Sequence, residues 1–325
     1  MGVERYGDPV VREAVARRVD AAWGLELPRS FFRFLDFLAS LGPAEERAMR
    51  DLELAPYGVM DLFADPSALP GEGLDIRVHG RYYRDPPEFL TFLHGGTDGL
   101  HFGLWSDDGR GCDGVASYWT NDGGDIERRH HTPLEAVRAQ IESAERDLAD
   151  MVADGEDVQE RLEGVGRLRV ALTGFETGER TETGLAYSEA YERRRPAVDT
   201  DRITTLDGAG ALVSGATALD RPPLGAADEY RFGTFMEKLF EDAEAVRAAR
   251  DEALRRAAAG DPAEALVLGR DLHWASYGEP EREGYARELL ALAYRELGRP
   301  ALAEIAAAHD RHRALANVEV LRRTR

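Results

Sequence analysis

The stretch "RYYRDPPEF" at residues 81–89 places charged side chains of both signs among aromatic rings, around a pair of prolines. The residues of interest in it are Arg81, Tyr82, Asp85, Pro86, Pro87, Glu88 and Phe89. One interpretation is that Arg81, Asp85 and Glu88 make a surface site. The other is a rigid corner between two strands whose charges are solvated or paired locally, because proline donates no backbone hydrogen bond and keeps the preceding residue extended. We favour the corner, with Phe89 buried beside it, since two prolines alone explain the spacing.

Histidine pairs offer a second kind of chemistry, metal binding. His309 and His312 share a face of a predicted helix, and His94 and His101 lie on neighbouring predicted strands. No HExxH arrangement accompanies them, and single histidines on strands and at helix ends are usually structural. The segment "DGAGAL" (207–212) also lacks the GxGxxG pattern of a dinucleotide site. We therefore predict neither a metal nor a cofactor.

The chain has few cysteine and lysine side chains that could act as nucleophiles. Cys112 is the only cysteine and sits in the turn-like stretch "DDGRGCDG" without a histidine beside it, so we interpret it as a bystander thiol. Lys238 is the only lysine, which leaves one candidate for amine chemistry. An independent enzyme is the function class that we favour least.

The composition of the chain argues against nucleic acids and membranes as binding partners. The chain has 61 acidic side chains against 41 Lys and Arg, a net charge of −20 that repels phosphate backbones, so we expect no direct nucleic-acid binding. No segment approaches the roughly 18 apolar residues of a membrane span. The N-terminus is charged and lacks the apolar core of a signal peptide. We expect a cytoplasmic protein that does not enter a membrane.

A length of 325 residues predicts about two domains. Residues 27–42 and 131–154 read as helices, the first from the apolar spacing of Phe31, Phe34, Leu35 and Leu38, the second from a capping box at Thr132. Strands are predicted at 74–83, 88–94, 99–105 and 114–119, and a further sheet segment at 204–214. Their short turns favour an antiparallel sheet. The prediction for 1–216 is an α/β domain built on that sheet, within an α+β fold.

After residue 216 the pattern changes. We predict a linker at 217–230 and an all-helical domain over 231–325, where Ala, Leu, Glu and Arg recur at helical spacing. Within it, "GDPAE" (260–264) resembles a helix start, with Asp261 as N-cap, Pro262 as the first residue and Glu264 as the capping-box acid. Residues 188–199 are interpreted as an exposed loop or hairpin.

Several stretches resemble the histone PARylation factor family, whose members join a poly(ADP-ribose) polymerase and redirect its modification. The stretches are "RYYRDPPEF", "TLDGAGALV", "LGRDLHWASYG" and "LLALAYRELGRPALAEI", within a likeness that runs over about residues 25–315. The resemblance implies an Asp-Glu pair before the helix of "AEALVLGRDL", which enters the partner's active site so that the Glu deprotonates a serine. The matching positions here are Ala258 and Ala259, and alanine cannot abstract a proton.

Asp261 and Glu264 are the nearby carboxylates that could substitute, although we favour the helix-capping interpretation for both. Arg221 matches the arginine of the family's Tyr-Arg partner contact, but Asp220 stands where the tyrosine is expected. Arg221, Asp261 and Glu264 are therefore our candidate partner-binding residues.

The segment "LPRSFFRFLDFLASLG" also resembles the opening of SUKH-type domains, a superfamily that includes many bacterial immunity proteins. Two functions follow. The first is a non-enzymatic accessory factor whose protein partner is an ADP-ribosyltransferase. The alternative is an immunity or adaptor protein that neutralises a toxin or binds another protein.

Overall fold

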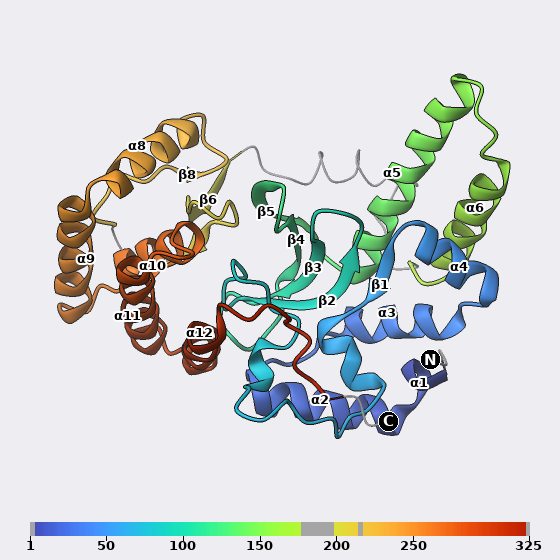
Figure 1. Cartoon of the computed structure of the whole chain (residues 1–325), viewed down its shortest axis with the longest axis horizontal. Coiled ribbons are helices and arrows are strands. Elements are labelled where there is room, and N and C mark those ends of the chain that lie inside the picture. Colours follow the sequence, from blue (N-terminus) through green and yellow to red (C-terminus); the bar gives the residue numbers. More distant parts are fainter. Residues whose placement is uncertain (1–3, 177–197, 214–216, 323–325) are drawn as a thin grey trace.

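The computed structural model describes residues 4–176, 198–213 and 217–322. The N-terminal helices are α1 (Glu4–Gly7), α2 (Pro9–Trp23), α3 (Arg29–Ser40) and α4 (Pro43–Asp51), followed by the 3₁₀ helices η1 (Gly58–Phe63) and η2 (Ile76–Val78). A helical hairpin, α5 (Pro133–Ala153) and α6 (Gln159–Thr173), comes after the sheet. The C-terminal helices are α8 (Glu229–Glu241), α9 (Ala243–Ala258), α10 (Ala263–Ala275), α11 (Pro280–Glu296) and α12 (Pro300–His312). Figure 1 shows the sheet in the middle, with the C-terminal helices at one side and α1–α6 at the other.

The central sheet is antiparallel, in the order β1-β2-β3-β4-β5. Its strands are β1 (Leu54–Pro56), β2 (Phe89–Gly95), β3 (Leu100–Trp105), β4 (Gly114–Trp119) and β5 (Gly123–His130). In the β2–β3 turn Gly96 (55°), Asp98 (58°) and Gly99 (75°) all have positive φ, a conformation that glycine adopts without strain. These strands and the helices around them confirm the predicted α+β fold.

Both faces of the sheet are covered. Side chains alternate along a strand, so Leu100, Phe102 and Leu104 of β3 face one side, where they join the main core with residues of α3 and α5. Trp105 belongs to the other side, in a second core with Phe89 and residues of β4, β5 and α10. Trp274 of α10 therefore packs on the sheet face opposite α3.

Several strand predictions were wrong or incomplete. Residues 74–83 form η2 and turns instead of a strand, because Asp75 accepts the N–H of Arg77 and the N–H of Gly80 pairs with the carbonyl of Val318 near the C-terminus. The sheet gains β1 and β5, which the sequence pattern did not predict. The 204–214 segment does not join it. That segment contributes β7 (Ala211–Leu212) to a separate sheet ordered β7-β6-β8, with β6 (Asp199–Ile203) and β8 (Pro223–Leu224).

The helices predicted over 27–42 and 131–154 are present, and the side chain of Thr132 accepts the N–H of Glu135 as predicted. Helix α6 was not predicted from the sequence. Most of the predicted 188–199 loop falls outside the described residues. The division at 217–230 stays a prediction, although β8 within it pairs with β6. No helix in the described ranges is both long and apolar enough to cross a membrane.

Candidate functional site

The position that the family resemblance singles out is the turn between α9 and α10. Helix α9 ends at Ala258, Ala259 follows as its C-cap, and both are exposed. Gly260 continues the turn in a left-handed conformation (φ 88°) that suits glycine. The turn therefore projects into solvent with methyl groups at the two positions where an Asp-Glu pair was expected.

Asp261 is the nearest carboxylate to this turn. It lies one residue before the N-cap of α10, which is Pro262 and not Asp261 as we predicted. Its carboxylate still accepts the N–H of Ala263 at 3.3 Å and lies 3.9 Å from Arg256, and its side chain is 33% exposed. Asp261 consequently stabilises the helix start while remaining reachable from solvent.

Glu264 does not form the predicted capping box. Its carboxylate is buried and accepts the N–H of Ala218 at 2.6 Å, with Arg221 at 3.4 Å. Asp271 lies 2.7 Å from the other guanidinium nitrogen of Arg221 and accepts the N–H of Leu206. Burial raises the pKa of Asp271, although Arg221 opposes that shift. This cluster fastens the chain around 206 and 218–221 to α10, so Arg221 and Glu264 are interior and present no charge to a partner.

The "RYYRDPPEF" motif is a corner, and Arg81, Asp85 and Glu88 in it are buried, so the interpretation of these three residues as a surface site was wrong. The guanidinium of Arg81 donates to the carbonyls of Pro86 and Phe89, both at 2.7 Å. Asp85 accepts from the Tyr118 hydroxyl at 2.6 Å and lies 2.9 Å from His101. The corner does not lie between two strands as predicted. Turns lead into it, one of them closed by the hydrogen bond from the N–H of Asp85 to the carbonyl of Tyr82, and β2 follows it. Phe89 is fully buried, as predicted.

The corner also joins the sheet to the C-terminal helices. The Tyr294 hydroxyl on α11 donates to Glu88 at 2.9 Å, and His273 on α10 lies 3.1 Å from the carbonyl of Asp85. Arg270, also on α10, donates to Asp207 at 2.6 and 2.9 Å. Burial raises the pKa of Glu88, while Arg270 lowers it. Because these groups are buried and hydrogen-bonded, they fasten α10 and α11 to the corner and to the chain at Asp207.

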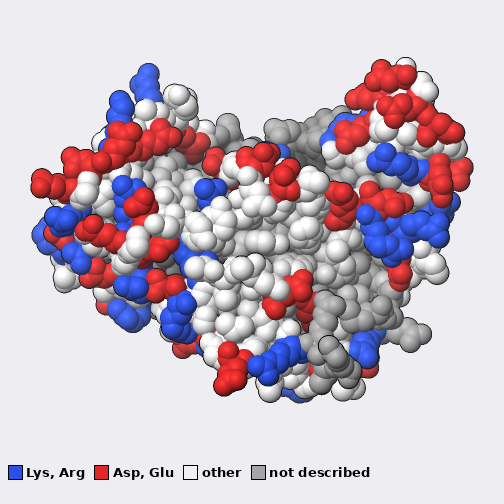
Figure 2. All heavy atoms as spheres, in the orientation of Figure 1, with Lys and Arg blue, Asp and Glu red and all other residues white. Residues whose placement is uncertain are grey.

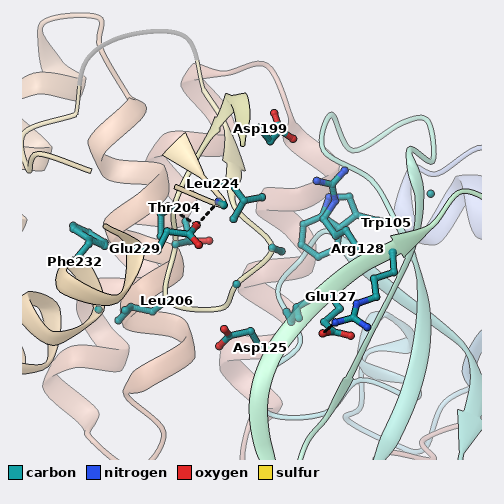
Figure 3. A pocket seen from close by; sticks show the side chains of 18 of the residues that line it. Trp105, Asp125, Glu127, Arg128, Asp199, Thr204, Leu206, Leu224, Glu229 and Phe232 are labelled. Carbon is teal, nitrogen blue, oxygen red and sulfur yellow. Dashed lines mark hydrogen bonds and ion pairs between the residues drawn. The ribbon is translucent and has the colours of Figure 1, made fainter. Parts of the chain in front are cut away.

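A cavity of about 840 Å³ opens between β5 and the start of α8. In Figure 3, Trp105 and Arg128 line one wall, while Leu206, Glu229 and Phe232 line the opposite wall. Burial raises the pKa of Asp125 on the β5 side, with Asp207 and Glu229 adding to the effect. No sequence pattern indicates this cavity, because its walls come from two distant parts of the chain, residues 105–131 and residues 199–237.

The metal-binding and thiol chemistry considered from the sequence has little support in the geometry of the described residues. Among the described residues, no group of three or more His, Cys, Asp and Glu side chains could hold a metal ion. His94 and His101 are paired across β2 and β3, but His101 is engaged by Asp85. Burial raises the pKa of the Cys112 thiol to about 12, which keeps it protonated and unreactive at neutral pH.

Sequence comparison matches part of the chain to a known protein family. A sequence model described as histone PARylation factor 1 matches residues 14–194. Three similar curated proteins share that description: those of Danio rerio (29% identical over 93 residues), Mus musculus (28% over 108) and Bos taurus (29% over 96). These matches cover 28%, 32% and 28% of this chain and only 27%, 31% and 28% of the relatives' own lengths.

Proposed function

Because the chain belongs to the histone PARylation factor 1 family, we propose that it is a non-enzymatic accessory factor that binds an ADP-ribosyltransferase. The observation that carries the proposal is the exposed α9–α10 turn with Ala258 and Ala259 where the family resemblance expects an Asp-Glu pair. A methyl group can pack against a partner but cannot accept a proton. The turn therefore contributes contact and not proton transfer.

The neighbouring carboxylates do not replace the missing base. Glu264 is buried beneath the turn and held by Arg221 and a backbone N–H, so it cannot reach a partner without breaking both contacts. Asp261 is reachable, but the first N–H of α10 and Arg256 already engage it. The protein would act by binding and orienting the transferase.

The surface charge favours a partner that is basic overall. Figure 2 shows acidic side chains gathered over the tip of the α5–α6 hairpin and along α8, with a largely uncharged region between them, while α9 carries charges of both signs. With a net charge of −20, association should weaken as salt screens these charges, over a Debye length of about 8 Å at 0.15 M. The comparisons give no support to the alternative of a SUKH-type immunity protein.

The test is serine modification by a candidate transferase with NAD, measured beside binding of the same proteins. We expect the wild type to bind and to leave the serine rate unchanged. The double variant Ala258→Asp/Ala259→Glu should raise that rate, by up to the roughly 10²–10⁴-fold that a general base contributes.

Asp261→Asn is the matched control. If the wild type stimulates serine modification and Asp261→Asn abolishes the stimulation while binding persists, the adaptor proposal is wrong and Asp261 is the base. If the wild type binds no transferase, the accessory function itself fails.

A further inference from the structure

Arg84 stands out among the arginines of this acidic protein because its charge has no partner among the residues that the structure describes. In the ranges that the structure describes, its guanidinium makes no hydrogen bond and no ion pair, and its Nε is buried without an acceptor. Arg221 and Arg270, near the joint between sheet and helices, are paired with carboxylates, and Arg81 donates to backbone carbonyls. A chain with 61 acidic side chains thus leaves this guanidinium unneutralised.

Aromatic rings hold Arg84 in place. Its guanidinium carbon lies 5.1 Å from the ring centre of Trp274 and 5.4 Å from that of Tyr83, within the range of cation–π attraction. Tyr83 in turn packs on Tyr277, with ring centres 4.4 Å apart, and the side chain of Tyr277 is half-exposed. The guanidinium is therefore positioned in advance, so binding a ligand to it costs little side-chain entropy.

The same patch has further unused donors. Within the described residues, neither the indole N–H of Trp274 nor the hydroxyl of Tyr277 makes a hydrogen bond. Trp274 itself is anchored from behind by Tyr118, at 5.4 Å between ring centres. A planar anion above Arg84 would thus meet a fork of guanidinium N–H groups flanked by aromatic rings, which is the geometry that carboxylates prefer.

We propose that Tyr83, Arg84, Trp274 and Tyr277 form a docking site for a carboxylate side chain of a protein partner. Tyr, Trp and Arg are the residue types that dominate the binding energy of protein interfaces. A polyphosphate would meet the repulsion of the whole chain at net −20, whereas a single carboxylate on an otherwise basic partner would not. At this site the positive group belongs to the acidic protein and the negative group to its basic partner. This reversed charge pair fixes the orientation of the complex.

The site lies at the far end of α10 from the α9–α10 turn, since Trp274 is next to the last residue of that helix. At 1.5 Å per residue the 13 residues of α10 span about 20 Å. Arg84 would therefore be a second anchor, separate from the turn. Only the identity of the partner, an ADP-ribosyltransferase, rests on the proposed function.

The first experiment needs no transferase. A fluorescein-labelled Gly/Ser 12-residue peptide with a central Glu-Trp-Glu, and its Gln-Trp-Gln counterpart, are titrated with the full chain by fluorescence anisotropy. We expect the Glu peptide to bind at least tenfold more tightly, and Arg84→Gln to abolish that difference. Equal binding of the two peptides overturns carboxylate recognition. Displacement of the Glu peptide by ADP at lower concentration than by glutarate would assign the site to phosphate instead.

The second experiment measures the affinity of a candidate transferase by surface plasmon resonance. Arg84→Gln should weaken it tenfold or more, and Arg84→Lys by less, because lysine keeps the charge but loses the planar fork. Arg17→Gln is the control for the charge change, since Arg17 is exposed and pairs only with Glu13 of its own helix among the described residues. Equal binding by Arg84→Gln and the wild type overturns the inference and leaves the proposed function standing.

If the wild type binds the Glu peptide but no transferase, the proposed accessory function is wrong and the carboxylate-docking site at Arg84 is supported. Circular dichroism melting checks that each variant folds. Tyr277→Ala is a second variant that removes only a half-exposed ring from the patch and should also weaken peptide binding.

Discussion

Replacing Arg221 by methionine would measure how strongly the buried cluster fastens the chain to α10. The guanidinium lies 2.7 Å from Asp271 and 3.4 Å from Glu264, and all three side chains are at most 1% exposed. Methionine has a similar volume, so the change removes the charge and leaves little cavity. Both carboxylates would remain buried without their counter-charge, which typically costs about 3–5 kcal/mol. We expect the free energy of unfolding to fall by about that amount.

The loss should depend on pH. Burial already raises the pKa of Asp271, and Arg221 is the group that opposes the shift, so its removal raises that pKa further. An acid with a raised folded-state pKa destabilises the protein at high pH, and the penalty is relieved as pH falls toward that pKa. Guanidinium chloride titrations at pH 7.5 and pH 5 should therefore show a smaller loss for Arg221→Met at pH 5.

Glu264→Gln is the matched variant, because it leaves the Arg221–Asp271 pair intact. It should cost only about 1–3 kcal/mol, the price of a weakened hydrogen bond to a buried N–H. A loss below about 1 kcal/mol for Arg221→Met, or an equal loss at both pH values, would refute the reasoning. It would mean that water reaches the cluster and that the contacts seen here do not hold the segment.

Three further predictions concern single side chains. Phe89→Ala should destabilise by about 3–5 kcal/mol in denaturant titration, because the ring is fully buried against Gly103, and a loss below about 1 kcal/mol would show that the corner is loosely packed. Cys112 should react with Ellman's reagent at pH 8 only after unfolding, since its pKa is raised to about 12; rapid reaction of the native protein would contradict this. Burial lowers the pKa of His130 to about 3 from 6.5, so its contribution to stability is present above pH 6.5 and is lost as pH falls, by about 2 kcal/mol at pH 5. His130→Gln should flatten that pH dependence, and an unchanged profile would argue against a neutral buried imidazole.

The helices at 27–42 and 131–154 were predictable from the sequence because their signals are local. The apolar spacing in 27–42 and the Thr132 capping box each depend on residues a few positions apart, and both helices formed where expected. The same holds for β2, β3 and β4, whose ends coincide with glycine-containing turns. Pro86-Pro87 predicted a corner and a buried Phe89 for the same reason.

The roles of the charged residues could not be predicted in this way. Glu264 sits at a position where a capping box is the usual local choice, yet its carboxylate is held by the chain at 218–221, more than 40 residues earlier. Arg81, Asp85 and Glu88 looked like surface charges but are buried at the joint with α10 and α11. The placement of Arg84 likewise depends on the ring of Trp274, 190 residues away in the chain. Sequence patterns report which residues share a helix or strand face; only tertiary packing decides which charge loses its water and which partner replaces it.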